Sequence, residues 1–386
     1  MLDHHSQHLR QELVASLVAS GVLHSPALQQ AFLTIPREVF VPGFYEEDET
    51  SPTMKWRYVH AHETSLEAYL AKVYRDQPLV TKTDKRGMPI SSSSMPSAMA
   101  EMLEALDVQT GLRVLEVGTG YNAALLAMLT GDPGAVVSIE YDPVLARSAA
   151  EAIGHVLGPG VQVITGDGFA GYAQGAPFDR IIATASVATV PMAWVEQLRV
   201  EGILVMDLQG SLASGFLVLE RTEAGARGYF LPQPLYFMPL VTQQTEAPHF
   251  PGMTDLSQEP CYASFVLTSD HAFPKNLSDT RFRWFLQWRI PGCHMSRRKQ
   301  IQRDTNATIS SILVIDPKTR ATVRFRQRSS ETAWEGEVYG VPHFWEELQQ
   351  VYAEFIALGE PRPHQYHLII KHQTVALTIG SLHLPL

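Results

Sequence analysis

The chain has 386 residues, 45% of them hydrophobic, which is enough to bury the cores of two or three domains. Its formal net charge of −10 argues against a nucleic-acid partner. No apolar run is long enough to cross a membrane, and the first residues lack the apolar segment of a signal peptide, so we expect a cytoplasmic protein. Two cysteines, Cys261 and Cys293, predict free thiols.

The first hundred residues predict helices, a loop and a short strand. Leu9, Leu13 and Leu17 share one face of an amphipathic helix that ends at Gly21. Serines at positions 91–94 precede another helix, and we expect one of them to cap it. The other predicted elements are a helix at 26–34, an extended segment at 35–42, a loop or partly ordered insertion at 45–65, a strand start at 74–80 and the helix at 97–106.

The stretch 111–127 carries the motif on which the functional interpretation depends. Residues 113–117 alternate as in a strand, stop at Gly118 and Gly120, and are followed by apolar residues at helical spacing from Ala123. Glycines at such a turn let the backbone approach a ligand, and the N–H groups of the new helix favour an anionic or hydroxyl-bearing group. This pattern predicts a nucleotide-like cofactor.

Two cofactors fit this turn. It matches the dinucleotide fingerprint in its alanine-ending form, and Glu140, at the end of the strand 135–140, lies near the spacing of a ribose-binding acid. S-adenosylmethionine needs the same ribose contact. It is favoured by Glu116 inside the turn, because a carboxylate attracts a sulfonium and repels a pyrophosphate. It is also favoured by Asp167 after a following strand and by the absence of a basic residue after the glycines.

Strands and helices alternate beyond this turn, which predicts a mainly parallel sheet covered on both faces. The predicted elements are a helix at 143–156, strands at 161–165 and 178–185, a helix at 192–198, a strand at 202–206 and antiparallel strands at 215–220 and 228–238.

A linker at 242–259, rich in Gln, Thr and Pro, precedes a second module. Its predicted elements are strands at 309–315 and 321–327, a helix at 343–358 and a hairpin at 366–371 and 374–379. Its histidines do not have zinc-ligand spacing, so we expect no metal. A basic cluster could receive an acidic peptide, although a solvated surface is the simpler interpretation; it comprises Arg281, Arg283, Arg289, Arg297, Arg298 and Lys299.

Six motifs together resemble the protein-L-isoaspartate O-methyltransferases, over roughly residues 9–210. The motifs, in chain order, are Ile35-Pro-Arg-Glu-Val-Phe-Val-Pro42, Tyr74-x-Asp76-x-Pro78-Leu79, Ile90-Ser91, Val114-Leu-Glu-Val-Gly-Thr-Gly120, Gly166-Asp-Gly168 and Ala176-Pro-Phe-Asp-Arg-Ile-Ile182. The resemblance implies an α/β fold with a seven-stranded, doubly wound, Rossmann-like class I methyltransferase domain and a smaller α+β C-terminal domain. It implies a substrate-side region at 1–100, a donor-binding domain at 101–241, a linker at 242–260 and an accessory domain at 261–386.

The resemblance also implies S-adenosylmethionine as the donor and methylation of an isoaspartyl or aspartyl carboxylate, whose ester can collapse to a succinimide or aspartimide. The predicted site is Ser91 for the substrate and, for the donor, Glu116, Gly118, Thr119, Gly120, Glu140 at the ribose, and Asp167 with Gly168 at the adenine. No metal is expected.

The expected partner is a protein or peptide, and two roles are open. One is repair of aged proteins, and the other is modification of a dedicated ribosomally made peptide, because the C-terminal module resembles the appended region of peptide-modifying homologues. The turn from Gly118 to Tyr121 is two residues shorter than is usual in the family. This shortening keeps open a peptide-binding adaptor with impaired cofactor binding, and an NAD-dependent oxidoreductase is the other alternative.

Overall fold

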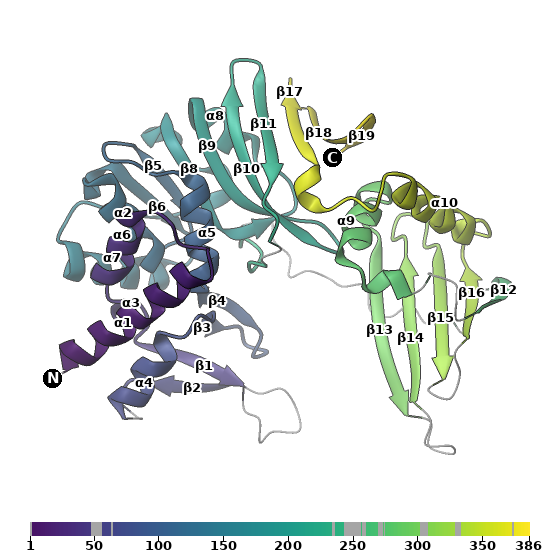
Figure 1. The fold of residues 1–386 in the computed structure, drawn as a ribbon, viewed down its shortest axis with the longest axis horizontal. Coiled ribbons are helices and arrows are strands. Elements are labelled where there is room, and N and C mark those ends of the chain that lie inside the picture. The colour runs from purple at the N-terminus through teal and green to yellow at the C-terminus, as the bar shows by residue number, and fades with distance from the viewer. Residues whose placement is uncertain are drawn as a thin grey trace.

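The computed structural model describes residues 2–47, 56–62, 65–233, 236–242, 256, 260–268, 273, 275–301, 308–328, 333–372 and 374–386. Its strands form a ten-stranded sheet, a four-stranded sheet beneath it and a five-stranded sheet to one side (Figure 1). Within these ranges, no helix combines the length and apolar character needed to cross a membrane. The predicted linker lies mostly outside the described residues, as does much of the predicted loop at 45–65.

The main sheet has the strand order β19-β18-β17-β11-β10-β9-β8-β5-β6-β7. Its parallel strands are β5 (Val114–Val117), β6 (Val136–Glu140), β7 (Gln162–Thr165), β8 (Phe178–Val187) and β9 (Leu198–Gln209). Its antiparallel strands are β10 (Ser214–Thr222), β11 (Gly225–Phe230), β17 (His367–Lys371), β18 (Thr374–Ile379) and β19 (Leu382–Pro385). The seven strands β5 to β11 confirm the predicted seven-stranded, doubly wound sheet.

Helices cover both faces of this sheet because its strands are apolar on both sides. Val114 and Val136 pack into a core with α5 and α6, whereas their neighbours Leu115 and Val137 belong to a core with α8 on the opposite face. The helices of this part are α1 (Leu2–Ala19), α2 (Pro26–Thr34), α3 (Arg37–Phe40), α4 (Leu66–Val73), α5 (Pro96–Leu106), α6 (Tyr121–Thr130), α7 (Pro143–Leu157) and α8 (Met192–Gln197).

The N-terminal sheet has the order β2-β1-β3-β4, so β4, which carries the serines, is an edge strand. Its strands are β1 (Gly43–Glu47), β2 (Trp56–His60), β3 (Leu79–Thr83) and β4 (Pro89–Ser93). Three predictions were wrong here. Within the expected loop at 45–65, residues 56–60 form strand β2, which pairs with β1. Part of the expected extended segment at 35–42 forms α3, and α5 begins after Met95 with no side-chain cap. The serines cannot cap α5 because three of them lie in β4; instead, the Ser97 N–H donates to Asp76 at 2.8 Å.

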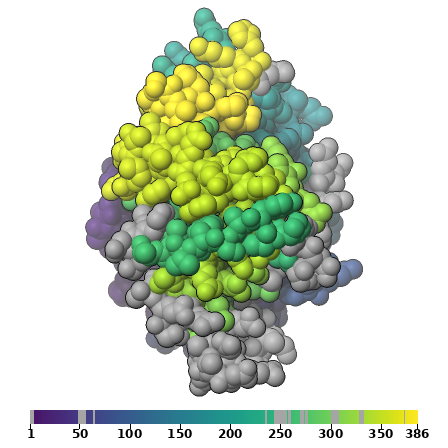
Figure 2. All heavy atoms as spheres, turned by 90° about the vertical axis from the view of Figure 1, so that its right-hand side faces the viewer, coloured from purple at the N-terminus to yellow at the C-terminus, as the bar shows by residue number. Residues whose placement is uncertain are grey.

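The C-terminal sheet has the order β12-β16-β15-β14-β13. Its elements are β12 (Cys261–Leu267), α9 (Thr280–Arg289), β13 (His294–Ile301), β14 (Thr308–Ile315), β15 (Thr322–Arg328), β16 (Trp334–Tyr339) and α10 (Phe344–Ala357). In Figure 2, the edge strand β12 (green) crosses the outer surface below α10 (yellow-green). The basic cluster is partly neutralised within the domain, since Arg281 pairs with Asp279 and Glu360.

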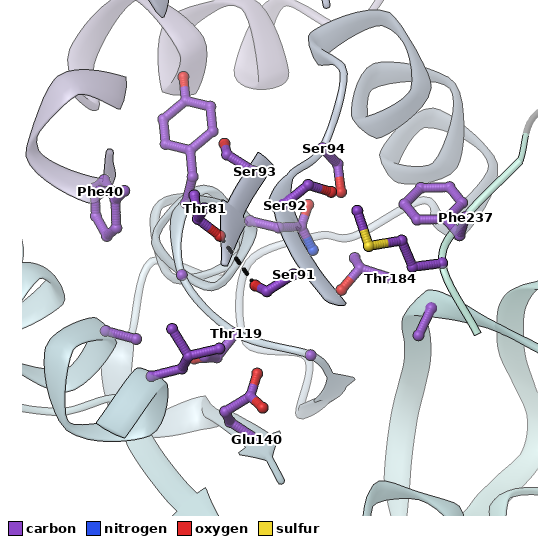
Figure 3. A pocket seen from close by; sticks show the side chains of 18 of the residues that line it. Phe40, Thr81, Ser91, Ser92, Ser93, Ser94, Thr119, Glu140, Thr184 and Phe237 are labelled. Atoms are coloured by element: carbon purple, nitrogen blue, oxygen red, sulfur yellow. Dashed lines mark hydrogen bonds between the residues drawn. The ribbon is translucent and has the colours of Figure 1, made fainter. Parts of the chain in front are cut away.

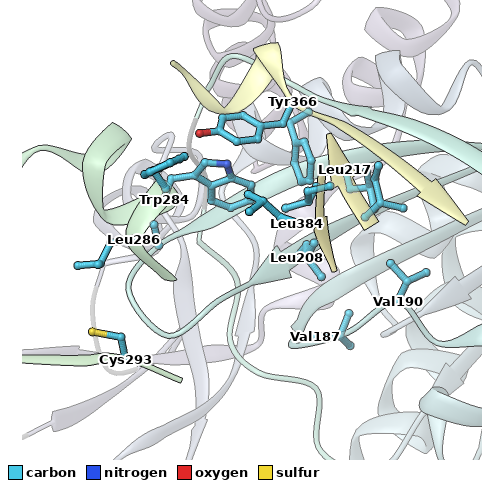
Figure 4. Close-up of a cluster of buried hydrophobic side chains, with 14 of the residues drawn as sticks. Val187, Val190, Leu208, Leu217, Trp284, Leu286, Cys293, Tyr366 and Leu384 are labelled. Atoms are coloured by element: carbon cyan, nitrogen blue, oxygen red, sulfur yellow. The ribbon is translucent and has the colours of Figure 1, made fainter. Parts of the chain in front are cut away.

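The last residues of the chain, 367–386, belong to the main sheet and not to the C-terminal domain. Strand β17 pairs with β11, so β17 to β19 extend the main sheet, and the predicted accessory domain at 261–386 is revised to end before β17. A single core joins the two parts, with Trp284 of α9 and Leu384 of β19 beside Leu208 and Leu217 of the main sheet (Figure 4). The Trp284 ring packs edge-on against Phe230 with centroids 4.9 Å apart.

We therefore predict that Trp284→Ala lowers the free energy of unfolding of the whole chain by about 3–5 kcal/mol, because it empties a fully buried volume in this shared core. Chemical denaturation followed by circular dichroism measures the change. Tyr262→Thr, at a half-exposed position of β12, is the control and should change the stability by less than about 0.5 kcal/mol. A loss in Trp284→Ala confined to the C-terminal sheet, with the main sheet melting as in the wild type, would contradict a shared core.

Candidate active site

A cavity of about 520 Å³ lies where the carboxyl ends of β5 and β6 meet strand β4. Its volume is within the usual range for small-molecule sites, about 300–1,000 Å³. Ser91 points into it from β4, with Glu140 and Thr119 on one side and Thr184 and Phe237 on another (Figure 3). The cavity thus joins the predicted substrate residue to most of the predicted donor residues.

The glycine turn forms the floor of the cavity. Gly118 and Gly120 have φ angles of 114° and 115°, a conformation that side chains other than glycine rarely adopt. A Cβ at Gly118 would lie 2.1 Å from the Thr184 hydroxyl oxygen, so only glycine fits there. Thr119 Oγ1 is buried and has no hydrogen-bond partner among the described residues. A buried hydroxyl of this kind needs a ligand or water, and the turn therefore fits a polar cofactor.

Glu140 ends β6 and lines the same cavity. One of its oxygens accepts the Asp142 N–H at 2.9 Å, which fixes the carboxylate at the wall. Burial raises the pKa of Glu140 above its usual value. Its place at the end of the second parallel strand is the one that a ribose-binding acid requires.

Glu116 needs a correction, because it lies beneath the turn and not in the cavity. Its side chain is fully buried, and it accepts a hydrogen bond from Asn122 at 2.8 Å. The Ser138 hydroxyl lies 2.8 Å from Glu116 Oε2 and 2.7 Å from the Gly118 carbonyl oxygen. Since β5 is buried on both faces, its acid supports the loop from below and does not line the cavity.

Burial raises the pKa of Glu116 to about 7. The Ser138 hydroxyl is the donor in both of its hydrogen bonds, so Glu116 and the Gly118 carbonyl share its single proton. Glu116 and Ser138 thus hold the glycine turn from below.

Asp167 and Gly168 are adjacent but differ in position. Gly168 lines the cavity, and a Cβ there would lie 2.5 Å from Val117. The Asp167 carboxylate accepts the Phe169 N–H at 3.0 Å and begins the short 3-10 helix Gly168–Ala170. Asp167 is not among the residues that line the cavity, so its local role is to shape this turn.

Ser91 forms a hydroxyl pair with Thr81 of β3, with the two oxygens 3.0 Å apart. The β3–β4 ladder shifts register here, from Val80 opposite Ser92 to Lys82 opposite Ser91. Such a bulge turns a side chain out of the regular alternation, and both hydroxyls line the cavity. The sequence analysis missed Thr81 because a bulge leaves no mark in the residue pattern.

Arg37 fixes the serine strand from behind. Its buried guanidinium donates to the carbonyls of Val73 and Ser94, each at 2.8 Å, and to the Ser93 carbonyl at 3.3 Å. No carboxylate accepts from it among the hydrogen bonds of the described residues, and burial lowers its pKa to about 10. Arg37 belongs to the sequence motif 35–42, but that motif alone did not predict a role for it.

The segment 236–241 closes the cavity on the side of β8 and β9. Ser186 of β8 donates its N–H to the Met238 carbonyl at 2.9 Å and accepts the Leu240 N–H at 2.8 Å. Asp207 of β9 accepts the Phe237 N–H at 3.0 Å. The sequence predicted a strand as far as 238, whereas β11 ends at Phe230 and this segment serves the site.

A doubly wound sheet with a glycine turn after its first parallel strand and an acid at the end of the second is the fold of class I methyltransferases, and dinucleotide-binding domains share these features. Comparison with known proteins gives the family. Residues 43–245 match the family described as Protein-L-isoaspartate(D-aspartate) O-methyltransferase. The chain belongs to this family. It is therefore a methyltransferase with S-adenosylmethionine as its methyl donor, which sets the NAD-dependent alternative aside.

Individual relatives agree. A protein-L-isoaspartate O-methyltransferase of Ignicoccus hospitalis is 34% identical over 239 residues, which are 61% of this chain and 98% of that protein. Protein-L-isoaspartate O-methyltransferase 2 of Archaeoglobus fulgidus is 35% identical over 219 residues, 56% of this chain and 85% of that protein. A solved structure named protein-L-isoaspartate O-methyltransferase has a similar fold, with a TM-score of 0.55 and 21% identity over 96% of this chain and 99% of that one.

We predict that Glu140→Ala weakens binding of S-adenosylhomocysteine by about 10- to 100-fold, because a hydrogen bond to a charged group contributes about 1.5–3 kcal/mol. Calorimetry measures the affinity. Glu151→Ala, on the exposed side of α7, is the matched control and should bind as the wild type does. Unchanged affinity in Glu140→Ala would remove Glu140 from the donor site.

The raised pKa of Glu116 gives a prediction for stability. Between pH 4.5 and about 7 the unfolded chain loses the proton while the folded chain keeps it, so this residue makes the protein less stable as the pH rises. Glu116→Gln preserves both hydrogen bonds without a titrating group. Its unfolding free energy should match the wild type near pH 4 and exceed it by about 3 kcal/mol near pH 8. A difference between the two proteins that stays constant with pH in denaturation curves would refute the raised pKa of Glu116.

Proposed function

We propose that this enzyme methylates an isoaspartyl or aspartyl side-chain carboxylate of a protein or peptide, and that Ser91 orients this carboxylate. The observation that carries the proposal is the hydroxyl pair of Ser91 and Thr81, which shares one cavity with the glycine turn and Glu140. If Thr81 donates to Ser91, the Ser91 proton is directed to an acceptor in the cavity. A carboxylate oxygen is such an acceptor.

Methyl transfer to a carboxylate does not require a general acid or base. An aspartyl carboxylate is already ionised at neutral pH, so no residue has to remove a proton. Bound S-adenosylmethionine supplies the electrophilic methyl group. The chain contributes alignment and a dry site: the serine strand holds the carboxylate, Glu140 holds the ribose, Gly168 borders the adenine, and residues 236–241 exclude water.

The product is a methyl ester. The carbonyl carbon of an aspartyl or isoaspartyl methyl ester is a better electrophile than that of a carboxylate. The neighbouring backbone nitrogen can therefore attack it, and methoxide leaves with the nitrogen's proton as methanol while the succinimide ring closes. This ring closure needs no further residue of the enzyme.

A direct test uses the full chain, labelled S-adenosylmethionine and a pair of peptides that differ only in an isoaspartyl or aspartyl acceptor. The expected result is label in a base-labile ester on at least one of them, and none on the same peptide with asparagine. Peptide binding without transfer would instead support the adaptor alternative.

We predict that Ser91→Ala lowers kcat/KM for peptide methylation by about 10-fold or more, because a hydrogen bond to a charged group is lost, while the affinity for S-adenosylhomocysteine stays within about twofold. Steady-state kinetics and calorimetry measure the two effects. Ser20→Ala, remote from the cavity on the loop after α1, is the control. Equal losses of turnover and donor affinity would show that Ser91 has only a structural role.

The presence of the C-terminal domain is not an argument for a dedicated peptide substrate over repair of aged proteins. The fold of a structure named protein-L-isoaspartate O-methyltransferase matches 96% of this chain, and so extends over that domain. A truncation that removes the C-terminal domain and everything after it cannot test substrate choice, because it also removes β17, β18 and β19 of the main sheet. Substrate choice is therefore better tested with point variants.

A further inference from the structure

The hairpin of β1 and β2 carries a row of aromatic rings. Tyr45 lies directly opposite Tyr58, and their ring centroids are 4.7 Å apart. The Tyr58 ring is 4.5 Å from that of His60, which is 4.8 Å from the ring of His62. Alternate residues of a strand share a face, so these rings form one continuous surface at the spacing of favourable aromatic pairs.

This aromatic surface lies away from the core. The opposite face of the hairpin carries Phe44 and Val59, which are buried with Tyr69 of α4. Tyr45, Tyr58 and His60 are instead partly exposed. The hairpin therefore packs against the core through one face, and its aromatic face is available for another contact.

Tyr58 connects this face with the cavity. Both Tyr58 and Gly43 line the cavity. A Cβ on Gly43 would lie 2.3 Å from the Tyr58 hydroxyl oxygen. The tyrosine ring thus lies across Gly43 of β1, and the glycine provides the room for it.

The sheet order sets the distance from this ring to the serine strand. The order β2-β1-β3-β4 puts the hairpin and Ser91 on opposite sides of β3. Neighbouring strands are about 4.8 Å apart, so a ring over β1 or β2 is about 10–14 Å from β4. An extended peptide covers that distance in about three or four residues.

We propose that Tyr58 and the rings stacked on it form a subsite for an aromatic side chain of the substrate, three or four residues from the carboxylate that is methylated. The inference rests on the proposed function and adds a sequence preference to it. An aromatic occupant suits this subsite because it can continue the edge-to-face row. Tyr58 is the specificity-determining residue, and Gly43 determines where its ring lies.

The test compares peptides with one acceptor residue and either tryptophan or alanine placed three or four residues before or after it. With the full-length wild type, kcat/KM should be about 5- to 10-fold higher for one of the tryptophan peptides than for its alanine partner. Tyr58→Ala should bring this ratio close to one. Gly43→Ala, which keeps every ring but displaces Tyr58, should do the same.

Two controls separate specificity from damage. Arg57→Ala changes an exposed side chain on the other face of β2 and should keep the preference. S-adenosylhomocysteine should bind all variants within about twofold, because Tyr58 lies outside the predicted donor residues. Equal rates for tryptophan and alanine peptides with the wild type would overturn the subsite and leave the proposed function standing. No methylation of any peptide would refute the proposed function itself.

Discussion

The buried guanidinium of Arg37 is the interaction on which the architecture of the site depends. It donates to carbonyls from the end of α4, from the approach to β3 and from the end of β4, including those of Val73, Gln77 and Ser94. A buried charge is tolerated only when its hydrogen bonds are satisfied. These backbone oxygens therefore have one arrangement that keeps Arg37 stable, and it is the arrangement that puts Ser91 at the cavity.

The glycine-turn side of the cavity is supported by a buried acid instead of a buried base. Beneath the glycine turn, Glu116, Ser138 and Asn122 form a hydrogen-bonded group inside the main sheet, and they bind the Gly118 carbonyl from below. The upper side of the turn faces the cavity. The two halves meet because α3, which carries Arg37, packs near the start of α6: Phe40 contacts the ring of Tyr121, 5.7 Å away between centroids. The two sides of the cavity are thus positioned by buried polar groups that lie outside it.

Local patterns predicted the elements that depend on local sequence. The helix 26–34 was placed at its observed bounds, because Pro26 and the Ser25 cap mark its start. The glycine turn and Glu140 were found because strand, turn and helix follow one another. The predictions that failed concern elements whose structure depends on residues far away in the sequence. The pairing of β17 with β11 joins residues 225–229 to 367–371, and no local pattern contains that information.

The residues of the site were also predicted only in part. Ser91, Gly118, Thr119, Gly120, Glu140 and Gly168 all line the cavity, whereas Glu116 and Asp167 support its walls. The position of Glu116 could have been predicted, since an acid within a fully buried parallel strand faces the interior on either side. Tyr58 could not have been found, because its ring reaches the cavity by crossing a glycine on the neighbouring strand.

The most direct test of the central claim, that one cavity brings donor and carboxylate together, is a crystal structure with S-adenosylhomocysteine and an acceptor peptide bound. The account predicts the ribose within hydrogen-bond distance of Glu140 and the peptide carboxylate within hydrogen-bond distance of Ser91. Glu116 should remain beneath the turn. A donor bound elsewhere, or a carboxylate held away from β4, would contradict it.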